Sequence, residues 1–154
     1  MRNTLLIMII SVGFVSCGKD KYTTNPQIKY KSVYPNALRS NIPTGQQVIP
    51  KVTIEVTDRE GDLGITDKDT AFVYITSIIN GQPEILPDSF PLPDIESILS
   101  KNFQADILIT PPFKRSTRPS PKTDTLTYEI YVKDFAKNKS NVITTEDAVY
   151  YIIP

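Results

Sequence analysis

Three acidic residues are closely spaced in the segment Asp58-Arg59-Glu60-Gly61-Asp62, and a fourth, Asp134, follows a separate segment of alternating residues. Carboxylate oxygens arranged around a glycine turn can converge on a hard cation, and Ca²⁺ takes roughly six to eight oxygen ligands. We therefore predict that Asp58, Glu60, Asp62 and Asp134 are candidate calcium ligands. The competing interpretation is that Asp and Gly are simply favourable turn residues.

This calcium site requires the two segments to end on the same side of the fold. Asp67, Asp69 and Asn138 are further candidate oxygen donors near these segments. The pattern is not an EF-hand, because the 12-residue loop and its flanking helices are missing. Calcium is thus the one candidate cofactor, and we predict no other cofactor-binding residues.

Few catalytic groups are available in this chain of 154 residues, which has no His and a single Cys. The absence of His removes Ser-His-Asp triads and His-ligated metals, and one Cys excludes an internal disulfide and structural zinc. A pair of carboxylates, as in glycosidases, is the remaining route to catalysis. Because a turn is not a cleft, we predict that the protein is not an enzyme and has no catalytic residues.

The charge of the chain is balanced, with 17 Lys and Arg against 17 Asp and Glu. Nucleic-acid binding rests on an excess of basic residues, so we expect no nucleic-acid partner. A local exception is the Pro-rich segment 111–123, which carries four basic residues. That segment is either a solvated loop or a contact site for an acidic partner or lipid headgroups.

The first 16 residues have the pattern of a signal peptide. Arg2 precedes an apolar run of 11 residues, Leu5–Val15, which is too short for a bilayer span of about 20 residues. The run ends at Val15-Ser16-Cys17-Gly18, where small residues flank the only thiol. An ordinary cleaved signal peptide that leaves a free Cys, or an uncleaved anchor, are the alternatives.

This end of the chain resembles the signal peptide and lipobox of bacterial lipoproteins. The resemblance implies cleavage before Cys17, lipidation of its sulfur, and acylation, such as palmitoylation, of the new amine. Two or more acyl chains anchor a protein stably to a membrane. We therefore expect residues 1–16 to be a lipoprotein signal peptide, residues 17–26 to be the lipidated Cys and a flexible stalk, and residues 27–154 to be one domain.

Alternating residues predict strands in that domain. Val52, Ile54 and Val56 point one way and Thr53, Glu55 and Thr57 the other, which is typical of a half-buried strand. Further strands are predicted at residues 27–34, 70–79, 103–109, 126–133 and 142–153, with a turn at Asn80-Gly81. Residues 94–100 are compatible with one or two helical turns. Six or seven antiparallel strands favour an all-β fold, a single antiparallel β-sandwich.

The turns carry a second resemblance. The segments T-D-R-E-G-D-L-G and K-D-F-A-K-N-K-S-N, together with the lipobox, look like small Gram-negative outer-membrane lipoproteins with an Ig-like or cadherin-like domain. Lys137 stands where those proteins usually have Gly. The resemblance implies a location in the outer membrane of the cell envelope, without fixing which face displays the domain. It also implies calcium binding at the end of a sandwich, as in cadherin-like domains.

These observations predict a lipid-anchored, non-catalytic binding or structural module. Its partners are the membrane, through the anchor, and an envelope protein or glycan. Protein partners rank above glycans, because the chain has no Trp for a flat sugar platform. The alternatives are a calcium-binding, cadherin-like adhesion or surface-coat module and, least favoured, a carboxylate-based enzyme that processes glycans.

Overall fold

A computed structural model describes residues 21–42, 49–66, 68–92 and 101–154 of the chain. The predicted signal peptide, Cys17 and the predicted helical turn at 94–100 lie outside these residues. Within the described ranges, no helix is long and apolar enough to cross a membrane.

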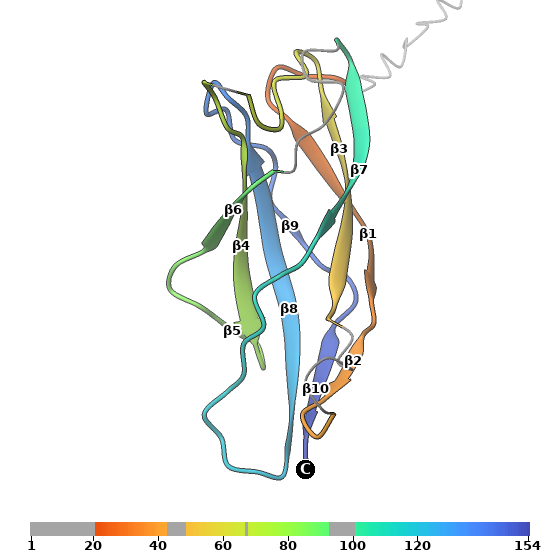
Figure 1. Cartoon of the computed structure of the whole chain (residues 1–154), viewed down its shortest axis with the longest axis vertical. Coiled ribbons are helices and arrows are strands. Elements are labelled where there is room, and N and C mark those ends of the chain that lie inside the picture. The colour runs from red at the N-terminus through yellow and green to blue at the C-terminus, as the bar shows by residue number, and fades with distance from the viewer. Residues whose placement is uncertain (1–20, 43–48, 67, 93–100) are drawn as a thin grey trace, which may run out of the picture.

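Two sheets pack face to face in an all-β sandwich (Figure 1). The smaller sheet has the strand order β1-β3-β7, with β1 at Gln27–Tyr34, β3 at Lys51–Asp58 and β7 at Phe103–Ile109. The larger sheet has the order β2-β10-β8-β4-β5. Its strands are β2 (Ala37–Arg39), β10 (Val149–Ile153), β8 (Lys122–Lys133), β4 (Phe72–Ile79) and β5 (Gln82–Pro83), with β6 (Asp88–Pro91) paired to β4 and β9 (Ile143–Thr144) paired to β8.

The core lies between the sheets and is built by alternate residues of the long strands. From the smaller sheet, Val52, Ile54 and Val56 of β3 are fully buried, as the alternation predicts. From the larger sheet, the buried hydrophobic residues are Val73 and Ile75 of β4, Leu126, Tyr128, Ile130 and Val132 of β8, and Val149, Tyr151 and Ile153 of β10. β4 is central in its sheet, because it pairs with β8 on one side and with β5 and β6 on the other.

The strand pattern differs from the prediction in three short elements and one break. β2, β5 and β6 have two to four residues each, too few for an alternation to show. Residues 142–153 form two strands instead of one, because Thr145 turns aside to bind β8: Tyr128 N donates to Thr145 Oγ1 at 3.1 Å, and Thr145 N donates to Tyr128 O at 2.9 Å. β2 and β10 run parallel, whereas the other paired strands are antiparallel.

The Asn80-Gly81 turn is confirmed and joins β4 to β5. Both residues have positive φ angles, 51° and 81°, which Asn and Gly adopt at little cost. β3 and β8 both end at the opposite end of the sandwich, the upper end in Figure 1. We name this end, formed by residues 58–64 and 134–140, the acidic pole.

Candidate metal centre

Three carboxylates meet at the acidic pole, and they come from both sheets. Asp58 is the last residue of β3, Asp62 lies in the loop that follows, and Asp134 comes directly after β8. One oxygen of each carboxylate lies within 4.8 Å of the others. A backbone hydrogen bond from Phe135 N to Asp62 O, 3.1 Å long, joins the two segments. The requirement that both segments end on the same side of the fold is therefore met.

Two of these carboxylates, Asp58 and Asp62, are incompletely hydrogen-bonded by the protein itself. Asp58 and Asp134 are fully buried. Asp58 Oδ2 accepts a hydrogen bond from Gly61 N at 2.6 Å, but Asp58 Oδ1 and Asp62 Oδ1 are buried and accept none. Two unit charges about 5 Å apart at an effective dielectric constant near 20 repel by about 3 kcal/mol. An arrangement that buries like charges and leaves their oxygens free requires compensation by a cation or a proton.

The proton affinity of the site reflects this arrangement. Burial, followed by the negative charge of Asp62 and Glu60, raises the pKa of Asp58 to about 6, against the lowering effect of the Gly61 N–H. Burial also raises the pKa of Asp134, although hydrogen bonds from Asn138 oppose it. In both groups the protein disfavours the charged carboxylate, so a bound cation would offset the charge that remains when the protons are lost.

The donor set suits a hard cation. All three side chains offer oxygen, the ligand that Ca²⁺ and Mg²⁺ prefer, and the cluster contains no sulfur or nitrogen donor. Oxygens that each lie about 2.4 Å from one Ca²⁺ are separated by at most about 4.8 Å, and the three carboxylates meet this limit. The carboxylates therefore fit Ca²⁺, with further oxygens supplied by backbone or water.

The other candidate donors lie apart from this group. Glu60 is exposed, and its Oε1 accepts a hydrogen bond from Thr24 Oγ1 at 3.3 Å. Asp69 is also exposed, and Asp67 lies outside the described residues. Asn138 supports Asp134 rather than joining it, since its backbone N donates to Asp134 Oδ1 at 2.7 Å and its Nδ2 donates to Asp134 Oδ2 at 2.8 Å.

The turn that positions Asp134 explains the second sequence motif. Lys137 has a φ angle of 68°, in the left-handed region that favours Gly. Ser140 Oγ accepts a hydrogen bond from Val132 N at 2.9 Å. Asn141 pairs with the backbone of Ile28 on β1 through two side-chain hydrogen bonds, of 2.8 and 2.9 Å. The motif thus links the end of β8 to the opposite sheet and fixes the position of Asp134.

The last residues of the predicted stalk lie against the same pole. Arg59 N donates to Thr23 O at 3.2 Å, and Arg59 Nη2 donates to Tyr22 O at 3.1 Å. Thr57 Oγ1 donates to Lys21 O at 3.2 Å. The segment that leads toward Cys17 is therefore connected to the loop that carries Asp58 and Asp62.

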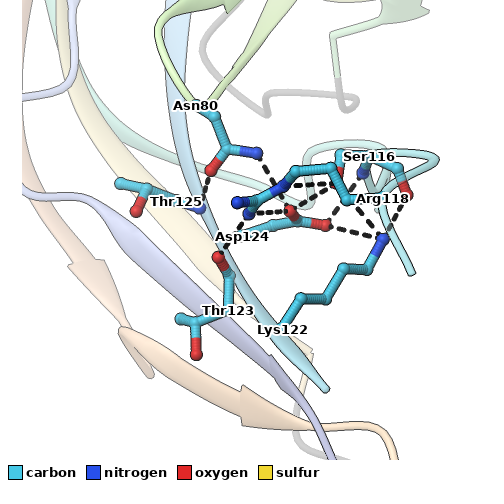
Figure 2. A network of polar contacts seen from close by, with 7 residues as sticks. All are labelled: Asn80, Ser116, Arg118, Lys122, Thr123, Asp124 and Thr125. Atoms are coloured by element: carbon cyan, nitrogen blue, oxygen red, sulfur yellow. Dashed lines mark hydrogen bonds and ion pairs between the residues drawn. The ribbon is translucent and has the colours of Figure 1, made fainter. Parts of the chain in front are cut away.

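A second buried carboxylate, Asp124, lies at the other end of the sandwich and was not singled out from the sequence as a structural centre. Its oxygens accept hydrogen bonds from Ser116, Asn80 and Arg118 and form an ion pair with Lys122 (Figure 2). Burial alone would raise the pKa of Asp124, but these hydrogen bonds hold it well below its usual range. Every charge here has a partner, so the network is structural.

This network also accounts for the basic, Pro-rich loop. Arg118 and Lys122 bind Asp124, and Lys114 forms ion pairs with Glu84 and Asp88. Most of the positive charge of this segment is thus offset within the chain, which favours the solvated-loop interpretation. Glu84 and Asp88 do line an open hollow beside the β5–β6 connection. Both carboxylates contact the Lys114 ammonium, so the three side chains form one ion-pair network.

Comparison with models of known protein families gives no match, and comparison with curated proteins gives none either. The functional argument therefore rests on the residues and geometry of this chain.

Proposed function

We propose that this protein is a lipid-anchored, non-catalytic β-sandwich module of the cell envelope whose acidic pole binds one Ca²⁺. The observation that carries the calcium part is the fully buried Asp58, whose Oδ1 accepts no hydrogen bond and which belongs to a group of three carboxylates from both sheets. The lipid anchor rests on the sequence around Cys17.

In this proposal Asp58, Asp62 and Asp134 are the calcium ligands. Bound Ca²⁺ offsets the repulsion among them and joins the end of β3 to the turn after β8. Glu60 is left to hold Thr24 of the stalk. The ion has a structural role: it fixes two loops of a rigid sandwich, and loops on such scaffolds commonly carry binding function.

The envelope location follows from the same proposal. The signal peptide is removed after residue 16, and the lipid on Cys17 anchors the mature chain, residues 17–154, in the outer membrane. The binding partner of the domain is an envelope protein or glycan. A carboxylate-based enzyme is disfavoured, because Asp58 and Asp134 are fully buried and the half-buried pair Glu84 and Asp88 is held in ion pairs with Lys114.

Isothermal titration of the mature chain with Ca²⁺ tests the ligand assignment. We expect one ion per chain in the wild type and no measurable binding in Asp62→Asn or Asp134→Asn, both checked for folding by circular dichroism. Asp69→Asn, which alters an exposed carboxylate outside the cluster, should bind as the wild type does. Equal binding by all variants would refute the site.

The anchor is tested separately by mass spectrometry of the protein extracted from envelope membranes. We expect the N-terminal peptide to begin at Cys17 and to carry the mass of a diacylglyceryl group and an additional acyl chain. A Cys17→Ser variant should lack the lipid and remain uncleaved. A mature chain with an unmodified thiol would refute the anchor and leave the calcium site unaffected.

A further inference from the structure

Three lysines rest on three aromatic rings on the outward face of the larger sheet, beside the acidic pole. Lys139 Nζ lies 4.1 Å from the ring centroid of Tyr131, Lys133 Nζ lies 5.3 Å from that of Tyr74, and Lys137 Nζ lies 5.8 Å from that of Phe72. We name these six residues the lysine–aromatic patch. Their separations are those of cation–π contacts.

The rings of the patch form a rigid support. Tyr74 of β4 and Tyr131 of β8 are directly paired across the two strands, and their rings stack at 4.7 Å with an interplanar angle of 5°. Phe72 is paired with Lys133 in the same register. Because paired strands fix the rings, each ring offers its lysine a cation–π contact at a defined place on the sheet.

The positive charge of this patch is not offset by the chain. Among the residues that the structure describes, Lys133, Lys137 and Lys139 form no ion pair, and Lys137 Nζ makes only a 3.3 Å hydrogen bond to the backbone oxygen of Thr70. Other lysines of the protein, such as Lys31 and Lys114, do bind carboxylates. The patch therefore presents hydrogen-bond donors and positive charge to solvent.

The position of the patch relative to the N-terminus identifies its partner. The segment Lys21–Thr24 is hydrogen-bonded to the acidic pole, and the turn 134–140 that carries Lys137 and Lys139 forms part of that pole. Only three residues lie between Cys17 and Lys21, and the four steps along the chain reach at most about 14 Å. A lipid on Cys17 therefore brings this end of the sandwich to the membrane surface.

We propose that the lysine–aromatic patch binds the phosphate groups of an anionic membrane surface and so orients the anchored domain. The proposal rests on the lipid anchor proposed above. A cluster of ammonium groups on an open sheet face matches a surface of phosphates, and each basic residue near such a surface strengthens binding about fivefold. Ca²⁺ at the neighbouring carboxylates reduces their negative charge, which further favours this orientation.

The test uses the thiol of Cys17, the only Cys of the chain, to couple the mature chain to a maleimide-bearing lipid. The first described strand, β1, begins at Gln27, so the mature chain retains every strand of the described sandwich. Vesicles contain phosphatidylcholine alone or with phosphatidylglycerol, and amine labelling of each lysine is followed by mass spectrometry. We expect Lys133, Lys137 and Lys139 to label several-fold more slowly with phosphatidylglycerol, and Lys51 at the other end to label equally in both.

High salt should remove the protection, because screening weakens exposed electrostatic contacts. Equal labelling of the three lysines on both kinds of vesicle would overturn the proposal. Protection by inorganic phosphate on phosphatidylcholine vesicles would also overturn it, and would indicate a site for free phosphate. Because the coupling is chemical, none of these outcomes depends on whether Cys17 is lipidated in the cell.

A second experiment compares vesicle binding by two triple variants that each lose three positive charges. Lys133→Gln, Lys137→Gln and Lys139→Gln together should weaken binding of the uncoupled mature chain to phosphatidylglycerol vesicles on the order of a hundredfold at low salt. The control changes Arg39, Lys51 and Arg115 to Gln, which removes the same charge. These residues are exposed and lie away from the acidic pole: Arg39 ends β2, Lys51 begins β3, and Arg115 precedes Ser116 of the Asp124 network. Equal losses, or binding to alginate in place of vesicles, would contradict membrane binding.

Discussion

Asp58 and Asp134 end strands of different sheets, yet their carboxylates belong to one group whose oxygens lie within 4.8 Å of one another. Both side chains are fully buried. Burial of like charges without a partner is costly, and proteins tolerate it where a metal or proton compensates. This relationship is the basis of the calcium proposal, since one cation between the carboxylates would contact residues from both sheets.

Stability without calcium should depend on pH in a direction set by Asp58. Its folded-state pKa is about 6, above the value of about 4 expected in the unfolded chain, so the folded state binds more protons between these values. In EDTA, the contribution of Asp58 should therefore destabilise the protein progressively as the pH rises from about 4 to about 6. Thermal unfolding across this range should show a smaller decline in Asp58→Asn than in the wild type.

With saturating Ca²⁺, the pH dependence of stability that these carboxylates cause should reverse. Stability should then increase as the pH rises, because the ion binds the deprotonated carboxylates. Without Ca²⁺, the raised pKa of Asp134 should lower stability as the pH rises, as the raised pKa of Asp58 does. An identical pH dependence in EDTA for wild type and Asp58→Asn would show that Asp58 is not the titrating group.

The Asp124 network predicts a large stability loss on removal of one charge. In Asp124→Asn, the new amide NH₂ lies against groups that themselves donate hydrogen bonds to the wild-type carboxylate. The Lys122 side chain, which is only 6% exposed, also loses its ion-pair partner. Breaking a buried ion pair costs about 3 to 5 kcal/mol, which urea unfolding would measure. Asp106→Asn, which disrupts an exposed ion pair with Lys31, should cost at most about 1 kcal/mol.

This loss should itself depend on pH. The folded-state pKa of Asp124 is lowered, so its contribution is present above the unfolded pKa of about 4 and disappears as the pH falls below it. The difference between wild type and Asp124→Asn should therefore shrink in acid. A difference that stays constant down to about pH 2 would argue that packing, not charge, stabilises this loop.

Lys137 provides a test of backbone strain at the acidic pole. Its φ angle of 68° is costly for a residue with a Cβ, by roughly 1 kcal/mol relative to Gly. Lys137→Gly should therefore raise the unfolding midpoint, whereas Lys137→Ala removes the same charge and keeps the strain. If both variants changed stability equally, the effect would come from the lysine side chain and not from the backbone.

The long strands were predictable because burial alternates along them. Val52, Ile54 and Val56 show the pattern without interruption, and the structure buries all three. The break between β9 and β10 was not predictable, since it depends on Thr145 binding a strand that is distant in the sequence. Strands of two or three residues, such as β2 and β5, leave no periodic signal.

The polar sites also include features that the sequence predicts and features that it does not. The convergence of Asp58 and Asp134 was predictable from the expectation that two strands end together. The exclusion of Glu60 from the group was not, because alternation along a turn does not reveal that Glu60 faces Thr24. Asp124 was missed because its partners Asn80 and Ser116 come from other loops, and a single Asp within a strand gives no signal of them.

Thermal unfolding of the mature chain, in millimolar Ca²⁺ and then in EDTA, tests the central claim most directly. An ion that binds only the folded state adds RT ln(1 + [L]/Kd) to stability, so we predict a midpoint about 5 °C or more higher in Ca²⁺. The shift should vanish in Asp62→Asn and Asp134→Asn and persist in Asp69→Asn. A wild-type midpoint that is the same in both solutions would contradict the calcium-binding pole.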